Sequence, residues 1–372
     1  MSTTCIETLI IGGGQVGLTA GYQLRRLGRA FLILDAHPRV GDAWRKRWDS
    51  LRLFTPARFN GLPGMRFPAA PRDFITKDQM ADFLAEYAKH FGLPIRNSAR
   101  VERLSREGDK YHARVNGHTY VADNVIVAMS SYQKPYVPAF AKELASDITQ
   151  MHSSSYENPS QLKPGDVLLV GAGNSGADIA MELSQQRSVW LSGNDVGEIP
   201  FRIETPFALT LGIPMVRFLG HYILSVHTPV GRRIRPKMLH GAGPRVRVKR
   251  EDLLSAGVAL VPRVRGIENG QPVLEDGKLL DVANVIWCTG YRGGFDWVDL
   301  PIFDDDNSPS HERGVVPRFP GLYFVGLHFL TAATSSTVTG MQRDVRHVVR
   351  HLHRRSPATL PAPARTVARL PG

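Results

Sequence analysis

The hydrophobic pattern of the chain shows one arrangement twice. Residues 6–11 form an apolar run that predicts a buried strand, residues 15–27 place apolar side chains at helical spacing, and residues 31–34 predict a second strand. A near copy starts at Val167 and ends in a strand predicted over 188–191. Strand–helix–strand units of this kind build parallel sheets, so the pattern predicts an α/β protein with two such units.

Further elements surround these two units. The same patterns predict a helix over 77–91, a last helix over about 340–353, and short strands over 101–104, 111–115, 119–127, 285–287 and 322–325. Because strands follow the second unit, we expect two Rossmann-like dinucleotide-binding domains, with the second inserted into the first. We place the first domain at 1–160 and 281–353, the inserted domain at 161–280, and a disordered tail rich in Pro, Ala and Arg at 354–372.

The inserted domain contains the most apolar long stretch, residues 207–226. Pro214, Arg217 and His221 interrupt this stretch, which argues against a membrane-spanning helix. We predict a buried helix pair or an apolar lid over a substrate pocket, within an insertion near 200–240. Peripheral contact with a membrane surface is an alternative that we do not expect.

Glycine spacing gives the two units a chemical meaning. The sequence IIGGGQVG places Gly12, Gly14 and Gly17 between a strand and a helix, in the G-x-G-x-x-G spacing that binds dinucleotides. The first glycine permits a tight turn, the second lets the backbone approach a pyrophosphate, and the third allows the helix to pack closely on the strand. The N–H groups of the helix N-terminus then face the phosphates.

The first unit also has an acid at the end of its second strand, Asp35. A carboxylate at this position accepts hydrogen bonds from the ribose hydroxyls and repels a 2′-phosphate. The first site therefore favours an unphosphorylated ribose, as in FAD or NAD.

The second unit repeats the glycine spacing with Gly171, Gly173 and Gly176, but no acid follows its second strand. Ser192 stands there, and we predict that its hydroxyl bonds a ribose hydroxyl or a phosphate oxygen. The arginine that often binds a 2′-phosphate is also absent from this position. Four cations elsewhere could fold towards it: Arg187, Arg202, Lys249 and Arg250. NADPH and NADH are both candidates for this site.

Composition narrows the classes of function. The net charge of +12 and the isoelectric point of about 9.9 suit an anionic ligand, and no nucleic-acid-binding motif accompanies the charge, so we expect no nucleic-acid partner. The two cysteines, Cys5 and Cys288, form no CxxC motif, which excludes a redox dithiol and fits a cytoplasmic protein. His347 and His351 share a helix face but lack acid or thiol neighbours, so we expect no metal site.

Several motifs together resemble the class B flavin-containing monooxygenases, near the YUCCA-like branch of that family. These motifs, spread over roughly residues 5–350, are IIGGGQVG, GDAWRKRWDSLRLFTP, FITKDQMADFL, GAGNSGADIAMEL, VIWCTGY and GLYFVGL. The resemblance implies that FAD binds to the first domain and NADPH or NADH to the inserted domain. Two nucleotide sites then hold a fixed redox cofactor and an exchangeable hydride donor.

The resemblance also implies roles for individual residues. Around FAD, these are Gly12, Gly14, Gln15, Gly17 and Asp35 at the ADP half, Val101 at the adenine through its backbone, Trp44, Leu53, Gly326 and Leu327 near the flavin ring, and Thr289 and Gly290 at the domain junction. Around the nicotinamide nucleotide, they are Gly171, Gly173, Asn174, Ser175 and Gly176.

The implied reaction is oxygenation of a small organic substrate at nitrogen, sulfur or a keto carbon, with NAD(P)H and O₂, through a C4a-(hydro)peroxyflavin. The cofactor carries this chemistry, so no catalytic acid or base is assigned. The linker signature of the family is incomplete, because Ser146 and Ile148 stand where Phe and Gly are expected, while His152 and Tyr156 match. This departure favours one alternative, an NAD(P)H-dependent flavin oxidoreductase without oxygen transfer. A remoter alternative is a nucleotide-binding sensor that is not an enzyme.

Overall fold

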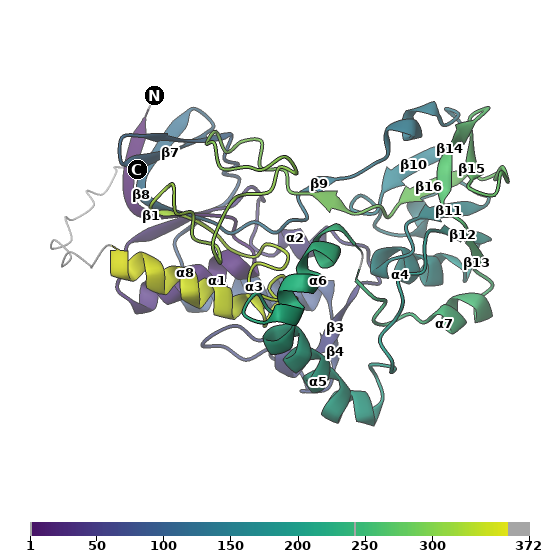
Figure 1. The fold of residues 1–372 in the computed structure, drawn as a ribbon, viewed down its shortest axis with the longest axis horizontal. Helices are drawn as coiled ribbons and strands as arrows, with labels where there is room; N and C mark the ends of the chain where they lie inside the picture. The colour runs from purple at the N-terminus through teal and green to yellow at the C-terminus, as the bar shows by residue number, and fades with distance from the viewer. Residues whose placement is uncertain (1, 242, 356–372) are drawn as a thin grey trace, which may run out of the picture.

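The two predicted units form two separate sheets, which lie side by side in Figure 1. The structure is a computed structural model and describes residues 2–241 and 243–355. The first sheet has the order β5 (Ile95–Arg96), β2 (Phe31–Leu34), β1 (Thr3–Ile11), β8 (His118–Val127), β7 (Lys110–Val115) and β6 (Arg103–Glu107), and β18 (Leu322–Phe324) pairs with β8. The second sheet has the order β10 (Thr149–His152), β16 (Asn284–Trp287), β11 (Val167–Val170), β12 (Val189–Ser192) and β13 (Ala259–Val261).

Smaller elements connect and flank these sheets. Two-stranded ribbons pair β3 (Arg52–Pro56) with β4 (Phe74–Thr76), β9 (Lys134–Pro135) with β17 (Tyr291–Arg292), and β14 (Val264–Glu268) with β15 (Gln271–Leu274). Short helical elements are α2 (Asp42–Arg45), η1 (Ala57–Phe59), η2 (Ala139–Glu143) and η3 (Pro159–Gln161).

Strand alternation divides the core of the first unit between the two faces of its sheet. Ile10, Ile33 and Ile126 face the helices α1 (Gln15–Arg26), α3 (Lys77–His90) and α8 (Met341–Arg355). Leu9 and Ile11 face the opposite side, where they pack with buried residues of β6 and β7. The second sheet follows the same rule, with α4 (Asn174–Leu183) and α7 (Arg250–Ser255) on one face.

The strand β18 confirms that the second domain is inserted into the first. It follows the whole second sheet in the chain, yet it pairs in parallel with β8, with Leu322 opposite Val125. The domain limits expected at 160 and 281 are wrong, however. β10 and β16 both belong to the second sheet, because β16 pairs with β10 on one side and with β11 on the other.

Two end points also differ from the prediction. β6 begins at Arg103, so Val101 lies in the loop before this strand. The helix α8 continues to Arg355, so the first two residues of the predicted tail are helical. The remainder of that tail, 356–372, lies outside the described residues.

The apolar stretch of the insertion is helical but is not a buried helix pair. It forms the π-helical turn η4 (Ala208–Gly212), α5 (Ile213–Phe218) and the π-helical turn η5 (Leu219–Ile223), and α6 (Pro229–His240) follows. Leu209 and Ile213 are buried, whereas Leu211 and Phe218 are more than half exposed. Among the described residues, no helix is long and apolar enough to cross a membrane.

Candidate functional site

The two glycine loops, residues 12–17 and 171–176, have the same backbone geometry. Gly12 and Gly171 follow β1 and β11 with φ of +109° and +115°, a conformation that only glycine adopts without strain. Gly14 and Gly173 precede α1 and α4 with φ of −76° and −77°. The repeat in the sequence is therefore a repeat in three dimensions.

The third glycine of each loop sets its helix directly over the end of its strand. A Cβ at Gly17 would collide with the carbonyl oxygen of Gly12, and a Cβ at Gly176 would collide with that of Gly171. A Cβ at Gly14, by contrast, would meet no atom within 4 Å. Open space therefore remains above the helix, where a pyrophosphate would bind.

The helices that follow the glycine loops begin without a cap. Neither α1 nor α4 has a side-chain cap or an acidic residue in its first turn. α3 shows the usual alternative, since Thr76 and Gln79 form a capping box at its start. Free N–H groups and the positive end of the helix dipole make both uncapped N-termini suitable for phosphate.

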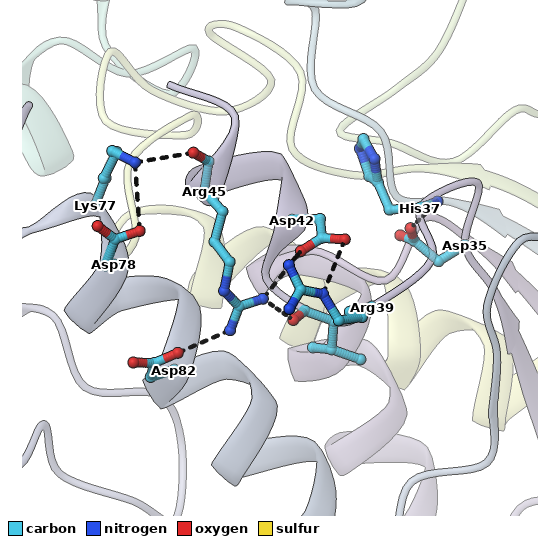
Figure 2. A network of polar contacts seen from close by, with 9 residues as sticks. Asp35, His37, Arg39, Asp42, Arg45, Lys77, Asp78 and Asp82 are labelled. Atoms are coloured by element: carbon cyan, nitrogen blue, oxygen red, sulfur yellow. Dashed lines mark hydrogen bonds and ion pairs between the residues drawn. The ribbon is translucent and has the colours of Figure 1, made fainter. Parts of the chain in front are cut away.

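Asp35 lies where the first site needs its acid. One carboxylate oxygen accepts a hydrogen bond from the Gly13 N–H. The other accepts one from the His37 N–H at 2.7 Å, and Figure 2 shows these two residues. Each oxygen keeps a further accepting lone pair. The geometry therefore suits the predicted contact with ribose hydroxyls.

In the second loop, the counterpart of Asp35 is Gly193. The Gly12 N–H donates at 2.8 Å to the carbonyl oxygen of the residue before Asp35. The Gly171 N–H donates at 2.7 Å to the carbonyl oxygen of Ser192, the residue before Gly193. The position that carries a carboxylate in the first site thus carries no side chain in the second.

The prediction that Ser192 contacts the nucleotide is therefore wrong. Ser192 is the last residue of β12 and is completely buried. Its hydroxyl donates to the carbonyl oxygen of Pro262 at 2.8 Å and accepts from the Val264 N–H at 3.0 Å. These bonds tie β12 to the chain after β13 and leave the hydroxyl no role at a ribose.

Asn174 differs in part from its predicted role. Its side chain holds a neighbouring segment, because Oδ1 accepts from the Val246 N–H at 2.8 Å and Nδ2 donates to the carbonyl oxygen of Pro244 at 3.0 Å. Asn174 and Ser175 still form the first turn of α4, so their backbone N–H groups face the predicted phosphate position. The side chain of Asn174 thus positions residues 244–246 beside the second glycine loop.

That segment brings a buried arginine to the second loop. Arg245 Nη1 lies 3.5 Å from the carbonyl oxygen of Ala172, and Nη2 lies 2.9 Å from Asp195 Oδ1. Its side chain is 4% exposed, and no partner among the described residues accepts from its Nε. The sequence did not single out Arg245, because the basic run RVRVK is typical of a charged surface. The available signal was the alternation of apolar residues with the cations, which indicates a partly buried segment.

Three of the four cations that the sequence suggested for this site bind elsewhere. Arg187 donates to the carbonyl oxygen of Lys163, Arg202 pairs with Asp252 at 2.8 Å, and Lys249 Nζ donates to the carbonyl oxygen of Ile199 at 2.6 Å. Arg245 is therefore the better candidate for contact with the nucleotide.

The short helix α2 holds Trp44 beside the first glycine loop. Trp44 Nε1 donates to Gln15 Oε1 at 3.2 Å, at the start of α1. Figure 2 shows how α2 is fixed: Arg45 contacts Asp42 at 3.1 Å and Asp82 of α3 at 2.8 Å. Burial raises the pKa of Asp42, but hydrogen bonds from two arginines outweigh it and leave the pKa below its usual value. An ionised Asp42 therefore helps to orient Trp44.

Residues 44–53 join the first loop to the second unit. Trp48 and Leu51 are buried in the core of the second unit, whereas Leu53 is buried in that of the first. Arg247 extends from the second unit and donates to the carbonyl oxygen of Leu53 at 3.4 Å. The predicted flavin-contacting residues thus lie where the two units meet.

The remaining predicted residues surround the first loop and the junction. The Ala99 N–H donates to the carbonyl oxygen of Asp35 at 2.8 Å, which brings the loop of Val101 to the end of β2. A Cβ at Gly326 would lie 2.9 Å from Val16 Cγ2, so the loop of Gly326 and Leu327 lies against the first turn of α1.

Thr289 and Gly290 connect β16 to the ribbon of β9 and β17, which lies between the two units in Figure 1. The Thr289 hydroxyl donates to the carbonyl oxygen of Tyr136. The carbonyl oxygen of Gly290 accepts from the Tyr136 N–H at 2.9 Å and lies 3.0 Å from His152 Nε2. The structure thus places both residues at the junction, and His152 supports them.

Asp178 of α4 is a buried acid that lies next to Arg247. Arg247 Nη1 lies 3.7 Å from Asp178 Oδ2, which has no hydrogen-bond partner among the described residues. Burial raises the pKa of Asp178 from 3.8 to about 6, although Arg247 acts in the opposite direction. The folded protein therefore binds this proton more tightly than the unfolded chain does, and stability should fall as pH rises from about 4 to about 6.

We expect the Asp178→Asn variant to lack this loss of stability. Relative to the unchanged protein, its free energy of unfolding should increase between pH 4 and pH 6 by about 1 to 3 kcal/mol and stay constant above pH 6. Its thermal midpoint should rise over the same pH range. Thermal unfolding followed by circular dichroism across this pH range measures the difference. Asp305→Asn, at an exposed position, should show no pH-dependent difference. Parallel curves for Asp178→Asn and the unchanged protein would mean that the Asp178 pKa is not raised.

Comparison with known proteins agrees with this geometry. Residues 9–195 match the model of the pyridine nucleotide-disulphide oxidoreductase family. A Geobacillus kaustophilus protein described as an uncharacterized CzcO-like oxidoreductase is 37% identical over 92% of this chain and 97% of its own length. Indole-3-pyruvate monooxygenase YUCCA1 of Oryza sativa subsp. japonica is 27% identical over 93% of this chain and 91% of its length.

A solved structure extends the likeness to three dimensions. The flavin-containing monooxygenase from Stenotrophomonas maltophilia is 26% identical and aligns with a TM-score of 0.75 over 95% of this chain and 99% of its own. The chain therefore belongs to the pyridine nucleotide-disulphide oxidoreductase family and, within it, to the class B flavin-containing monooxygenases, enzymes whose cofactors are FAD and NADPH.

Proposed function

We propose that the chain is a monooxygenase that uses FAD, NADPH and O₂ to oxygenate a small organic substrate at nitrogen, sulfur or a keto carbon. The connection between the two glycine loops supports the proposal. Residues 44–53 run from the first loop into the core of the second unit, and Arg247 returns to Leu53. Two dinucleotides that extend from these loops towards this segment would bring their reactive rings together, as hydride transfer requires.

The open space above Gly14 and the uncapped start of α1 fit the pyrophosphate of FAD. Asp35 would hold its ribose, the backbone of Val101 its adenine, and Trp44 and Leu53 would lie near its ring. FAD held there would supply the redox chemistry, namely acceptance of a hydride from NADPH and activation of O₂, of which one oxygen atom goes to the substrate and the other to water. The named residues bind and orient, and none of them serves as a general acid or base.

The second loop would hold NADPH at the start of α4. Gly193 removes the carboxylate that would repel a 2′-phosphate, and Arg245 supplies a cation at the same place. Asp195 and Glu198 contact Arg245, at 2.9 and 3.7 Å, and hold its guanidinium beside the loop. We therefore assign the 2′-phosphate to Arg245.

Alanine at the second glycine of each loop should separate the two sites. Gly14 and Gly173 have φ and ψ of −76° and −174°, and −77° and −169°, which alanine also adopts, so both variants should fold. Gly14→Ala should weaken FAD binding by about tenfold or more, and Gly173→Ala should do the same to NADPH alone. Retained flavin absorbance and calorimetric titration with NADPH measure the two effects. Loss of FAD from Gly173→Ala would reverse the assignment.

Arg245→Ala should weaken binding of the 2′-phosphate specifically. We expect the Kd of NADPH and of adenosine 2′,5′-bisphosphate to rise by about tenfold, and that of NADH and AMP to change by less than about twofold. Calorimetric titration measures all four without turnover. Arg202→Ala, whose arginine pairs with Asp252, is the matched control and should change none of them. Equal weakening of all four ligands by Arg245→Ala would show that Arg245 only supports the loop.

The reaction itself is tested with isotopic oxygen. With ¹⁸O₂, NADPH and a panel of amines, sulfides, ketones and keto acids, we expect one class of substrate to gain a single labelled oxygen atom for each NADPH consumed. NADPH consumption balanced by hydrogen peroxide, with no labelled product from any class, would instead favour a flavin oxidoreductase. Failure of the protein to bind FAD would overturn both the monooxygenase and the flavin oxidoreductase.

A further inference from the structure

The helical segment from 207 to 239 carries an exposed apolar face. Ten of the fifteen large apolar side chains that are exposed among the described residues lie within it. Five recur at intervals of three or four residues from the N-cap of η4 through α5 and η5, and they are 44 to 57% exposed: Phe207, Leu211, Met215, Phe218 and Tyr222. This spacing places them along one side of the helical segment, and Figure 1 shows α5 at the lower edge of the molecule with α6 above it.

The opposite side of this segment is firmly attached, so the exposed face is not a frayed end. Leu209 and Ile213 are buried in a small core with aromatic residues of the first unit. His221 Nδ1 lies 3.1 Å from the Thr334 hydroxyl, and the Val226 N–H donates to the carbonyl oxygen of Thr331 at 2.9 Å. A helix that is apolar on its inner and outer sides needs a second apolar environment for the outer one.

Charge identifies that environment. Residues 205–249 contain eight lysines and arginines and no acidic residue. Four of the cations lie on α6, which follows the apolar helices directly, and Arg232, Arg233 and Lys237 are exposed. A second copy of the chain would bring like charges together across the same face, which disfavours self-association. An anionic surface is attracted instead.

We propose that residues 207–239 dock on the surface of an anionic lipid bilayer. The apolar side chains would enter the boundary between headgroups and acyl chains, and the α6 cations would contact lipid phosphates. A row of exposed apolar side chains beside exposed cations suits the surface of an anionic bilayer. This proposal does not depend on the reaction proposed above.

Sedimentation with lipid vesicles tests the proposal on the full-length chain. We expect binding to vesicles of phosphatidylcholine mixed with phosphatidylglycerol, weaker binding to phosphatidylcholine alone, and a decrease with added salt. Leu211→Ser combined with Phe218→Ser should lower the partition coefficient by about tenfold or more. Arg232→Gln combined with Arg233→Gln should lower it on the anionic vesicles and remove much of the salt dependence.

Two matched controls separate the face from general hydrophobicity. Leu254 and Leu279 are 51% and 41% exposed, and both lie in the second unit away from the segment. Leu254→Ser and Leu279→Ser should bind vesicles as the unchanged protein does, and circular dichroism should show all variants folded. Equal losses in these controls, or no binding to anionic vesicles, would overturn the proposal. So would a dimer in analytical ultracentrifugation that the Leu211→Ser and Phe218→Ser pair abolishes, because the face would then belong to a second copy.

Discussion

A close contact between two glycines determines where each proposed nucleotide site lies. Because Gly17 has no side chain, it can approach the carbonyl oxygen of Gly12, and α1 then starts directly above the end of β1. Gly176 and Gly171 repeat the contact under α4. Each helix thus presents an uncapped N-terminus at the carboxyl edge of a parallel sheet, where dinucleotides bind. One backbone condition, met twice, accounts for both sites.

No strand pairing among the described residues joins the two sheets, so the segments that link the units set the relation between the proposed sites. Trp48 fills the core of the second unit from a segment of the first, and Arg247 returns from the second unit to Leu53. Asp178 balances that arginine at a cost, since burial raises its pKa and disfavours its charged form near neutral pH. Buried charge is retained here beside the proposed meeting place of the cofactors. Arg247, whose Nη1 lies 3.7 Å from Asp178 Oδ2, offsets part of this cost.

The helices between 207 and 239 differ from the other helices because one of their apolar sides is exposed. They bury only their inner side, and a basic, acid-free stretch accompanies an apolar outer side. A core contact would need the outer side covered by the chain, and the described residues do not cover it. The segment is therefore the proposed membrane contact, whereas the two sheets carry the proposed cofactor sites.

The sequence by itself determined the α/β class, the insertion of one unit into another, and the glycine loop and acid of the proposed first site. These features depend on local patterns, namely strand and helix periodicity, glycine spacing and an acid directly after an apolar strand. Tertiary structure decided which residue of the second unit takes the position that Asp35 has in the first. The apolar pattern of β12 ends at Leu191, but the strand continues through Ser192, which pairs in register with Val170 and Val261. The position proposed to face the nucleotide is therefore Gly193.

Arg245 and the exposed helices were hidden from the sequence for the same reason. Asn174 places Arg245 at the glycine loop through hydrogen bonds to residues 70 and 72 positions later in the chain. Apolar residues between 207 and 226 indicate burial, yet only the packed structure shows which side finds a partner. Local patterns indicate the secondary structure and burial that each segment favours, whereas contacts between distant segments decide which groups are left free to bind.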